Sequence, residues 1–105
     1  MPTPYLSEVE APSRAEVDAL RGLTVIEFGT EWCGHCRAAQ ILIAQALSEQ
    51  PQCRHLKVED GPGRALGRSY QVKRWPTLII LRDGQVIDRL VRPTATQDVL
   101  NALHT

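Results

Sequence analysis

The chain has 105 residues, twelve acidic and twelve basic side chains, and a formal net charge of zero. This length suits one domain with a core of several packed elements, so we predict a single domain over residues 1–105. The neutral balance offers no broad basic field for a nucleic acid, and ample aliphatic residues argue against disorder. The longest apolar runs are far too short to cross a bilayer, so we expect no membrane partner.

The N-terminus and the cysteines give an expectation for the compartment. The first residues, Met1 to Tyr5, lack the basic start and the apolar run of a secretory signal. The chain has three cysteines, two of them spaced as Cys-x-x-Cys, which is too few for an extracellular disulfide framework. We therefore expect a cytoplasmic protein in which the paired cysteines are catalytic or bind a metal. We also expect a monomer.

The first half of the chain alternates between strand and helix signals. Tyr5–Val9 predicts a short edge strand, and the capping-box sequence Ser13-Arg14-Ala15-Glu16 predicts a helix that begins there and ends at Gly22. Leu23–Gly29 is rich in β-forming residues and predicts a buried strand. Cys33–Gln50 predicts a long helix, whose apolar face is expected to consist of Ala38, Ile41, Leu42, Ala44 and Leu47.

The second half predicts further strands and shorter helices. In chain order these are a strand over Arg54–Glu59, a short helix from Pro62 to Ser69, strands over Thr77–Leu81 and Val86–Val91, and a helix over Asp98–Leu103. Asp83-Gly84 has the residue types of a hairpin turn between the last two strands. The element order predicts an α/β fold with a central mixed β-sheet and helices on both faces.

The cysteine pair lies where a buried strand gives way to the long helix. The first turn of a helix has four backbone N–H groups without partners, and these favour a thiolate at Cys33. Cys36 is three residues further on, so it faces the same side of the helix and lies within reach of a disulfide. We expect Cys33 to attack a target disulfide and Cys36 to resolve the mixed disulfide, without a cofactor.

A zinc half-site is the alternative for this pair. Zinc would need a second pair of ligands, and the remaining candidates are His35, Cys53, His55 and His104, whose spacing matches no zinc motif. We therefore expect no metal and interpret Cys53 as a small apolar packing residue.

Three motifs make the chain resemble the thioredoxins. They are Trp32-Cys33-Gly34-His35-Cys36 after an apolar strand, Trp75-Pro76-Thr77 before the next long strand, and Asp83-Gly84 in the closing hairpin. The resemblance covers roughly Leu23 to Leu103 and implies the thioredoxin fold. It implies a thiol–disulfide oxidoreductase of the protein-disulfide reductase or isomerase type that contributes to cell redox homeostasis. Its partners would be proteins bearing disulfides or thiols, and a reductase or other redox protein. The alternative function is a binding or co-chaperone module with secondary redox activity.

The resemblance also implies catalytic roles for two residues beside the cysteines. Glu27 interrupts an apolar strand where thioredoxins usually carry a buried Asp, which is thought to accept the proton of the resolving thiol. Burial should raise the pKa of Glu27, and Lys57 or His55 is expected as its partner. His35 stands where bacterial thioredoxins usually carry Pro. Its backbone N–H and a positive ring would both stabilise the Cys33 thiolate.

The remaining expectations concern the substrate groove. Pro76 matches the cis-proline of the family, opposite the cysteines. Trp32 and Gly34 are expected beside the substrate, and Trp75 is expected to flank the groove or else to pack in the core. The chain departs from the family pattern at Gly29, where a second Trp is usual, at Arg92-Pro93, where Gly is usual, and at Arg74. A bulky Arg92 should narrow or charge the groove.

Overall fold

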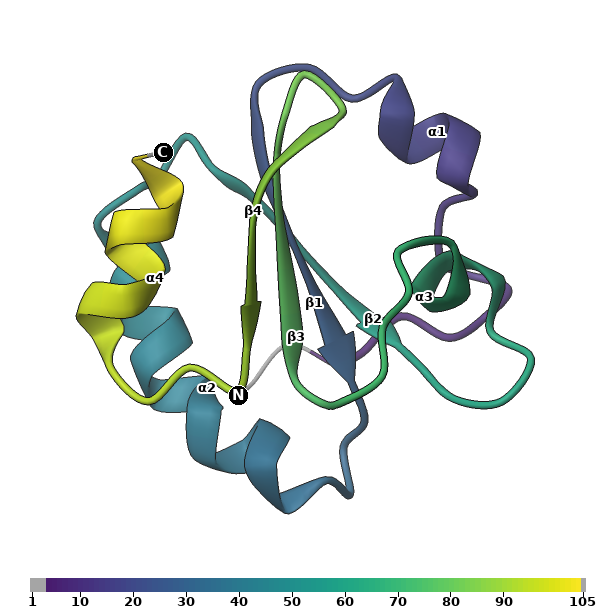
Figure 1. The fold of residues 1–105 in the computed structure, drawn as a ribbon, viewed down its shortest axis with the longest axis horizontal. Helices are drawn as coiled ribbons and strands as arrows, with labels where there is room; N and C mark the ends of the chain where they lie inside the picture. Colours follow the sequence, from purple (N-terminus) through teal and green to yellow (C-terminus); the bar gives the residue numbers. More distant parts are fainter. Residues whose placement is uncertain (1–3, 105) are drawn as a thin grey trace.

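A computed structural model describes residues 4–104, which form four strands and four helices (Figure 1). The strands are β1 (Leu23–Gly29), β2 (Arg54–Glu59), β3 (Thr77–Arg82) and β4 (Gln85–Val91). The helices are α1 (Arg14–Asp18), α2 (Gly34–Ser48), α3 (Ala65–Ser69) and α4 (Thr96–Leu103). Within these residues, no helix is long and apolar enough to cross a membrane.

The strands form one mixed sheet in the order β2-β1-β3-β4. β1 pairs in parallel with β2 and antiparallel with β3, and β4 closes the sheet as a hairpin with β3. The predicted turn is present: Asp83 and Gly84 both have positive φ values, 52° and 81°. A side chain at Gly84 would collide with the backbone carbonyl of Asp18, so glycine also allows α1 to approach the hairpin.

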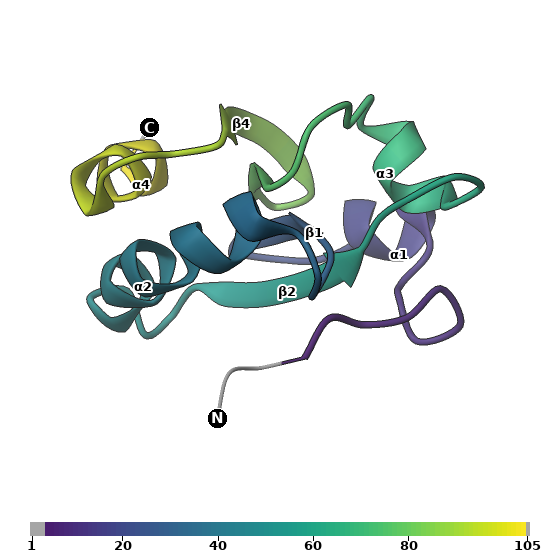
Figure 2. The same ribbon diagram turned by 90° about the horizontal axis from the view of Figure 1, so that it is seen from below.

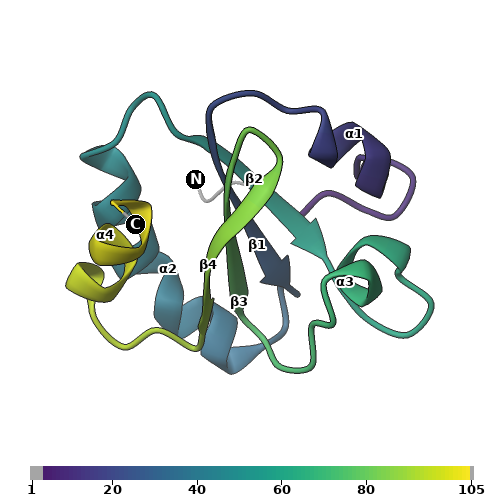
Figure 3. The same ribbon diagram turned by 45° about the horizontal axis from the view of Figure 1, so that its top comes forward.

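Helices cover both faces of the sheet, as the sequence predicts. Figures 1 and 3 place α2 and α4 on one side and α1 and α3 on the other, and Figure 2 shows the same division from below. The core against α2 and α4 includes Leu23, Val25, Ile43, Ala46, Leu78, Ile80, Val99 and Leu103. The core against α1 and α3 includes Val17, Ile26, Phe28, Val58, Leu66, Tyr70, Ile79 and Leu81. Alternate residues of β1 and β3 therefore serve opposite cores.

The predicted strand over Tyr5–Val9 is wrong. Only Leu6 pairs with the sheet, in an isolated parallel bridge to Val58 of β2. The chain then turns at once, because the backbone N–H groups of Glu10 and Ala11 donate to the Ser7 carbonyl. This single bridge still fixes the residue before it, Tyr5, beside β2.

The helix boundaries differ from the predicted ones at several ends. The capping box at Ser13 is confirmed, but α1 ends at Asp18 instead of Gly22. The chain beyond it is held by the hairpin, since the Gly22 N–H donates to the Asp83 carboxylate at 2.7 Å. α3 begins at Ala65, because Pro62 lies in the preceding turn, and α4 begins at Thr96, two residues before the predicted start.

The predicted apolar face of α2 is right for Leu42 and Leu47, which pack against the core, and wrong for Ala38, Ile41 and Ala44, which are exposed. The helix buries Cys36, Ala39, Ile43 and Ala46, whereas Ile41 is 72% exposed. Apolar residues occur on nearly all sides of this helix, so the spacing fits two different faces. The sheet selects the face that carries Cys36, which brings the second cysteine down onto β1.

Candidate active site

The two cysteines lie at the junction between β1 and α2. Cys33 is the N-cap of α2, and its Sγ accepts a hydrogen bond from the Cys36 backbone N–H at 3.3 Å. Both carry free thiols, and Cys33 is 8% exposed whereas Cys36 is 1% exposed. Cys33 is therefore the more accessible thiol of the pair.

Cys36 packs against the end of β1. A Cβ atom on Gly29 would lie 2.5 Å from the Cys36 Sγ, so the helix can sit this close only because residue 29 has no side chain. Burial raises the pKa of the Cys36 thiol to about 11, and the hydrogen bond with Cys33 adds to the rise. Cys36 therefore keeps its proton at neutral pH.

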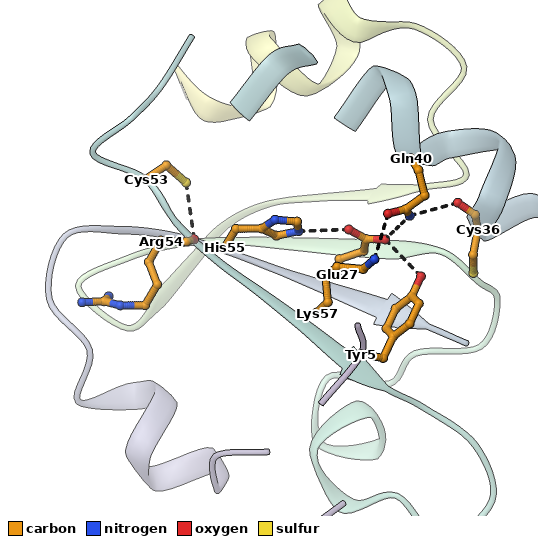
Figure 4. A network of polar contacts seen from close by, with 8 residues as sticks. All are labelled: Tyr5, Glu27, Cys36, Gln40, Cys53, Arg54, His55 and Lys57. Carbon is orange, nitrogen blue, oxygen red and sulfur yellow. Dashed lines mark hydrogen bonds and ion pairs between the residues drawn. The ribbon is translucent and has the colours of Figure 1, made fainter. Parts of the chain in front are cut away.

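Glu27 lies on the same face of β1 as Gly29, two residues earlier, and is fully buried. Its Oε2 accepts hydrogen bonds from the Gln40 amide at 2.6 Å and from the Tyr5 hydroxyl at 3.1 Å. Its Oε1 lies 3.0 Å from Nε2 of His55 on the neighbouring strand β2. Figure 4 shows the carboxylate enclosed by these three side chains.

The expectation of a raised Glu27 pKa is wrong. Burial does oppose ionisation, but the hydrogen bonds from His55 and Gln40, together with the charges of His55 and Lys57, outweigh it and lower the pKa of Glu27 below its ordinary value. A buried carboxylate that accepts several hydrogen bonds stays ionised. His55 is thus the direct partner, and Lys57 also extends the network by donating to Oε1 of the Gln40 side chain at 2.9 Å.

Sequence reasoning missed two members of this network, Gln40 and Tyr5. Gln40 is four residues after Cys36, and its amide also donates to the Cys36 carbonyl at 3.0 Å. It was missed because the buried face of α2 was assigned to other residues. Tyr5 comes from a segment far away in sequence, and the available signal was Gly29, whose missing side chain leaves the space beside which the Tyr5 hydroxyl lies.

Two tryptophans mark the surface beside the cysteines. The rings of Trp32 and Trp75 meet edge to face with centroids 5.6 Å apart, and Trp32 is 70% exposed. The Trp75 indole N–H donates to the Asp60 carboxylate at 2.8 Å, and the Asp60 N–H donates to the Gly29 carbonyl at 3.0 Å. Trp75 is thereby tied to the end of β1 and lies at the surface, half-buried, rather than in the core.

The peptide bond between Trp75 and Pro76 is cis, as the resemblance implies, and Pro76 is buried. Arg92 holds this segment from the side of β4. Its Nε donates to the Trp75 carbonyl and its backbone N–H donates to the Pro76 carbonyl, both at 2.9 Å. Arg92 has a φ of 51°, in the left-handed region that favours glycine.

The other predicted residues lie at the surface near the site or away from it. Gly34 and His35 form the exposed first turn of α2, and Arg74 is exposed beside Trp75. Cys53 packs at the edge of the core under α2 and α4, away from the pair. Among residues 4–104, no three His, Cys, Asp or Glu side chains gather in a way that could hold a metal ion.

Comparison with known proteins decides the family. The thioredoxin family model matches residues 7–105. The chain belongs to the thioredoxin family. Its structure superposes with a TM-score of 0.83 on thioredoxin 2 from Pseudomonas aeruginosa PAO1 in its reduced form, at 54% identity over 97% of this chain and 93% of that one. The architecture is accordingly a thioredoxin fold.

Other relatives of this thioredoxin-family chain are more distant. A Chlamydia trachomatis thioredoxin is 34% identical over 67% of this chain and 69% of its own length. A thioredoxin H-type from Ricinus communis is 30% identical over 68% of this chain and 60% of its own length. The chain spans little more than half the length of several such relatives. Mitochondrial thioredoxin 3 from Saccharomyces cerevisiae shares the fold at 19% identity, with a TM-score of 0.77 and coverage of 97% of this chain and 92% of that one.

Proposed function

We propose that this chain is a thiol–disulfide oxidoreductase that exchanges disulfides in protein substrates through Cys33 and Cys36. The observation that carries the proposal is the arrangement of the two thiols. Cys33 caps the N-terminus of α2 with its sulfur on a backbone N–H, while Cys36 is buried beneath it and protonated. An N-terminal helix position favours negative charge on sulfur, which is the form that attacks a disulfide.

The reaction then proceeds in two displacements. The Cys33 thiolate attacks one sulfur of the substrate disulfide, forms a mixed disulfide and releases the other sulfur as a thiolate. Cys36 next attacks the Cys33 sulfur, the bond from Cys33 to the substrate breaks, and the second substrate sulfur leaves as a thiolate. The substrate disulfide is reduced to two thiols, and Cys33 and Cys36 are oxidised to a disulfide.

The first displacement prepares the second. The hydrogen bond with Cys33 and the charge of Cys33 both raise the pKa of Cys36, and both end once Cys33 is bonded to substrate. Burial still holds the proton on Cys36, so the second displacement gains from a base. We propose Glu27 for this role, because it is ionised and lies on the same face of β1 as Gly29, against which Cys36 packs.

The surface around Cys33 suggests how a substrate would bind. We propose that an extended substrate segment binds beside Cys33, along Trp32, Gly34, Trp75 and Pro76. His35, exposed on the first turn of α2, would stabilise the Cys33 thiolate through its backbone N–H and ring. We further propose a cytoplasmic monomer that a separate reductase or redox protein returns to the dithiol form.

The function is tested by insulin reduction with dithiothreitol as the electron source. The parent protein should accelerate the reaction, and Cys33→Ser should abolish it. Cys36→Ser that is reduced and then freed of dithiothreitol before it meets insulin should accumulate mixed disulfides, which a non-reducing gel detects. Cys53→Ser is the matched control and should behave as the parent. If Cys36→Ser turns over as the parent does, the assigned roles are wrong. If the parent does not accelerate reduction but binds proteins through the same surface, a binding module replaces the enzyme.

A further inference from the structure

We propose that the Tyr5 hydroxyl carries the proton from the Cys36 thiol to the Glu27 carboxylate during the resolving step. This inference rests on the proposed function and adds a residue that comes from outside the strand and helix of the active site. Three observations carry it: the position of the hydroxyl between the two groups, the way the Tyr5 side chain is held, and the glycine that makes room for it.

The hydroxyl lies between the donor and the acceptor of the proton. It donates to Glu27 Oε2 at 3.1 Å. A Cβ atom on Gly29 would lie 3.0 Å from this hydroxyl and 2.5 Å from the Cys36 Sγ, so the oxygen and the sulfur flank the same small space. Figure 4 shows the Tyr5 oxygen facing both the Glu27 carboxylate and the side chain of Cys36.

The electrostatic coupling runs through the same three groups. Burial raises the pKa of Tyr5, and the charge of Glu27 and interaction with Cys36 raise it further. In return, interaction with the Tyr5 hydroxyl lowers the pKa of Cys36. A hydroxyl that keeps its own proton at neutral pH can still pass a proton, because it can accept one while it gives one up.

Tyr5 is held in this position from several sides. The neighbouring residue, Leu6, makes two backbone hydrogen bonds with β2. Its N–H donates to the Lys57 carbonyl at 2.7 Å, and its carbonyl accepts from the Glu59 N–H at 2.9 Å. The Lys57 ammonium lies 4.4 Å from the centroid of the Tyr5 ring. The ring is therefore fixed by backbone pairing and by a cation–π contact, neither of which depends on its hydroxyl.

The step balances without an added reactant. As the Cys36 sulfur bonds to the Cys33 sulfur, its proton passes to the Tyr5 oxygen, and the Tyr5 proton passes to Glu27 Oε2. The Cys33–substrate bond breaks and its electron pair leaves on the substrate sulfur. Tyr5 is unchanged, and Glu27 gives its proton up to solvent, which reaches the network at His55, whose side chain is 28% exposed.

The test separates attack from resolution. Reduced protein in a Cys53→Ser background is mixed with 5,5′-dithiobis(2-nitrobenzoate), which releases one coloured thiolate on attack by Cys33 and a second on resolution by Cys36. Tyr5→Phe keeps the ring over Lys57 and should leave the first phase unchanged, but slow the second about tenfold. Its second phase should also rise more steeply with pH, because only pre-ionised Cys36 can then react. Besides Tyr5 and Cys36, the charged groups that face Glu27 are His55 and Lys57, and both are intact in this variant.

Tyr70→Phe is the matched control. Its hydroxyl is buried without a hydrogen-bond partner among residues 4–104, and its ring lies in the core under α1 and α3. This variant should match the parent in both phases.

An unchanged second phase in Tyr5→Phe, or equal slowing of both phases, overturns the inference. If Glu27→Gln slows resolution and Tyr5→Phe does not, the relay is wrong while the proposed function stands. If no Cys33-dependent thiolate is released by the parent, the proposed function itself fails.

Discussion

Nε2 of His55 lies 3.0 Å from Oε1 of Glu27 on the adjacent parallel strand, and this contact joins a partly exposed side chain to a fully buried one. Burial alone would raise the pKa of Glu27. The contact with His55, together with the hydrogen bond from the Gln40 amide to Oε2, lowers that pKa instead. Glu27 is therefore an ionised group that the surrounding donors stabilise, and the lowered pKa determines how the stability of the protein depends on pH.

Replacing Glu27 with Gln should destabilise the protein at neutral pH. The folded pKa of Glu27 lies below its ordinary value of 4.5, so the ionised form contributes stability above that pH, and this contribution is lost as the pH falls through the folded pKa. We expect Glu27→Gln to lower the free energy of unfolding by about 1–3 kcal/mol at pH 7. The difference should shrink below pH 4.5.

Urea unfolding at pH 7, 5 and 3 measures this difference. The exposed Glu49→Gln serves as the control, and its effect on the free energy of unfolding should be small. A Glu27→Gln variant that is more stable than the parent at pH 7, or whose deficit grows towards acid, would contradict the lowered pKa.

Gly29 should tolerate no side chain. The Cβ of Gly29→Ala would lie 2.5 Å from the Cys36 sulfur and 3.0 Å from the Tyr5 hydroxyl, so one or both must move. Overpacking of this kind typically costs about 1–3 kcal/mol, and we expect that loss in urea unfolding. Gly34→Ala is the control for stability, because its Cβ meets nothing within 4 Å. If the two alanine variants are equally stable, α2 moves away from Gly29 without cost and the prediction is wrong.

His35→Pro should lower the reduction potential of the Cys33–Cys36 pair by tens of millivolts. Proline removes a backbone N–H and a ring that both favour the Cys33 thiolate, and about 30 mV corresponds to 1.4 kcal/mol for this couple. The first turn of a helix accepts proline, so the fold should persist. Equilibration with glutathione measures the potential. His35→Ala keeps the N–H and separates the two contributions; if neither variant shifts the potential, His35 has no tuning role.

Arg92→Gly should improve the use of peptide disulfides. The substitution frees the Trp75 carbonyl, which now accepts from Arg92 Nε, for a backbone N–H of the substrate. A hydrogen bond of this kind is worth about 1 kcal/mol, so we expect KM to fall by about two- to tenfold. Glycine also accepts the left-handed φ of 51° without strain, so stability should change little. Arg92→Lys is the control for charge, because it retains the positive charge of residue 92 without the Nε donor. An unchanged KM in Arg92→Gly would mean that the carbonyl takes no part in binding.

From the capping box at Ser13 onward, the sequence by itself determined the order of the elements and the position of the cysteines. β-forming residues in Leu23–Gly29, a capping box at Ser13 and a turn at Asp83-Gly84 act through local backbone preferences, which operate wherever the chain folds. The motifs around Cys33 and Pro76 were recognisable from the sequence because each is a contiguous run of residues.

Only the tertiary structure decided which side chains complete the site. The apolar pattern of α2 fits more than one face, and packing on β1 selects the face that carries Cys36 and Gln40. Glu27 is ionised because side chains of β2 and α2 donate hydrogen bonds to it, and no local sequence pattern reveals these donors. Tyr5 is brought to the sulfur by a single backbone bridge at Leu6. Contacts between residues distant in sequence set these features, because the energy of burying a charge or a thiol depends on everything that surrounds it.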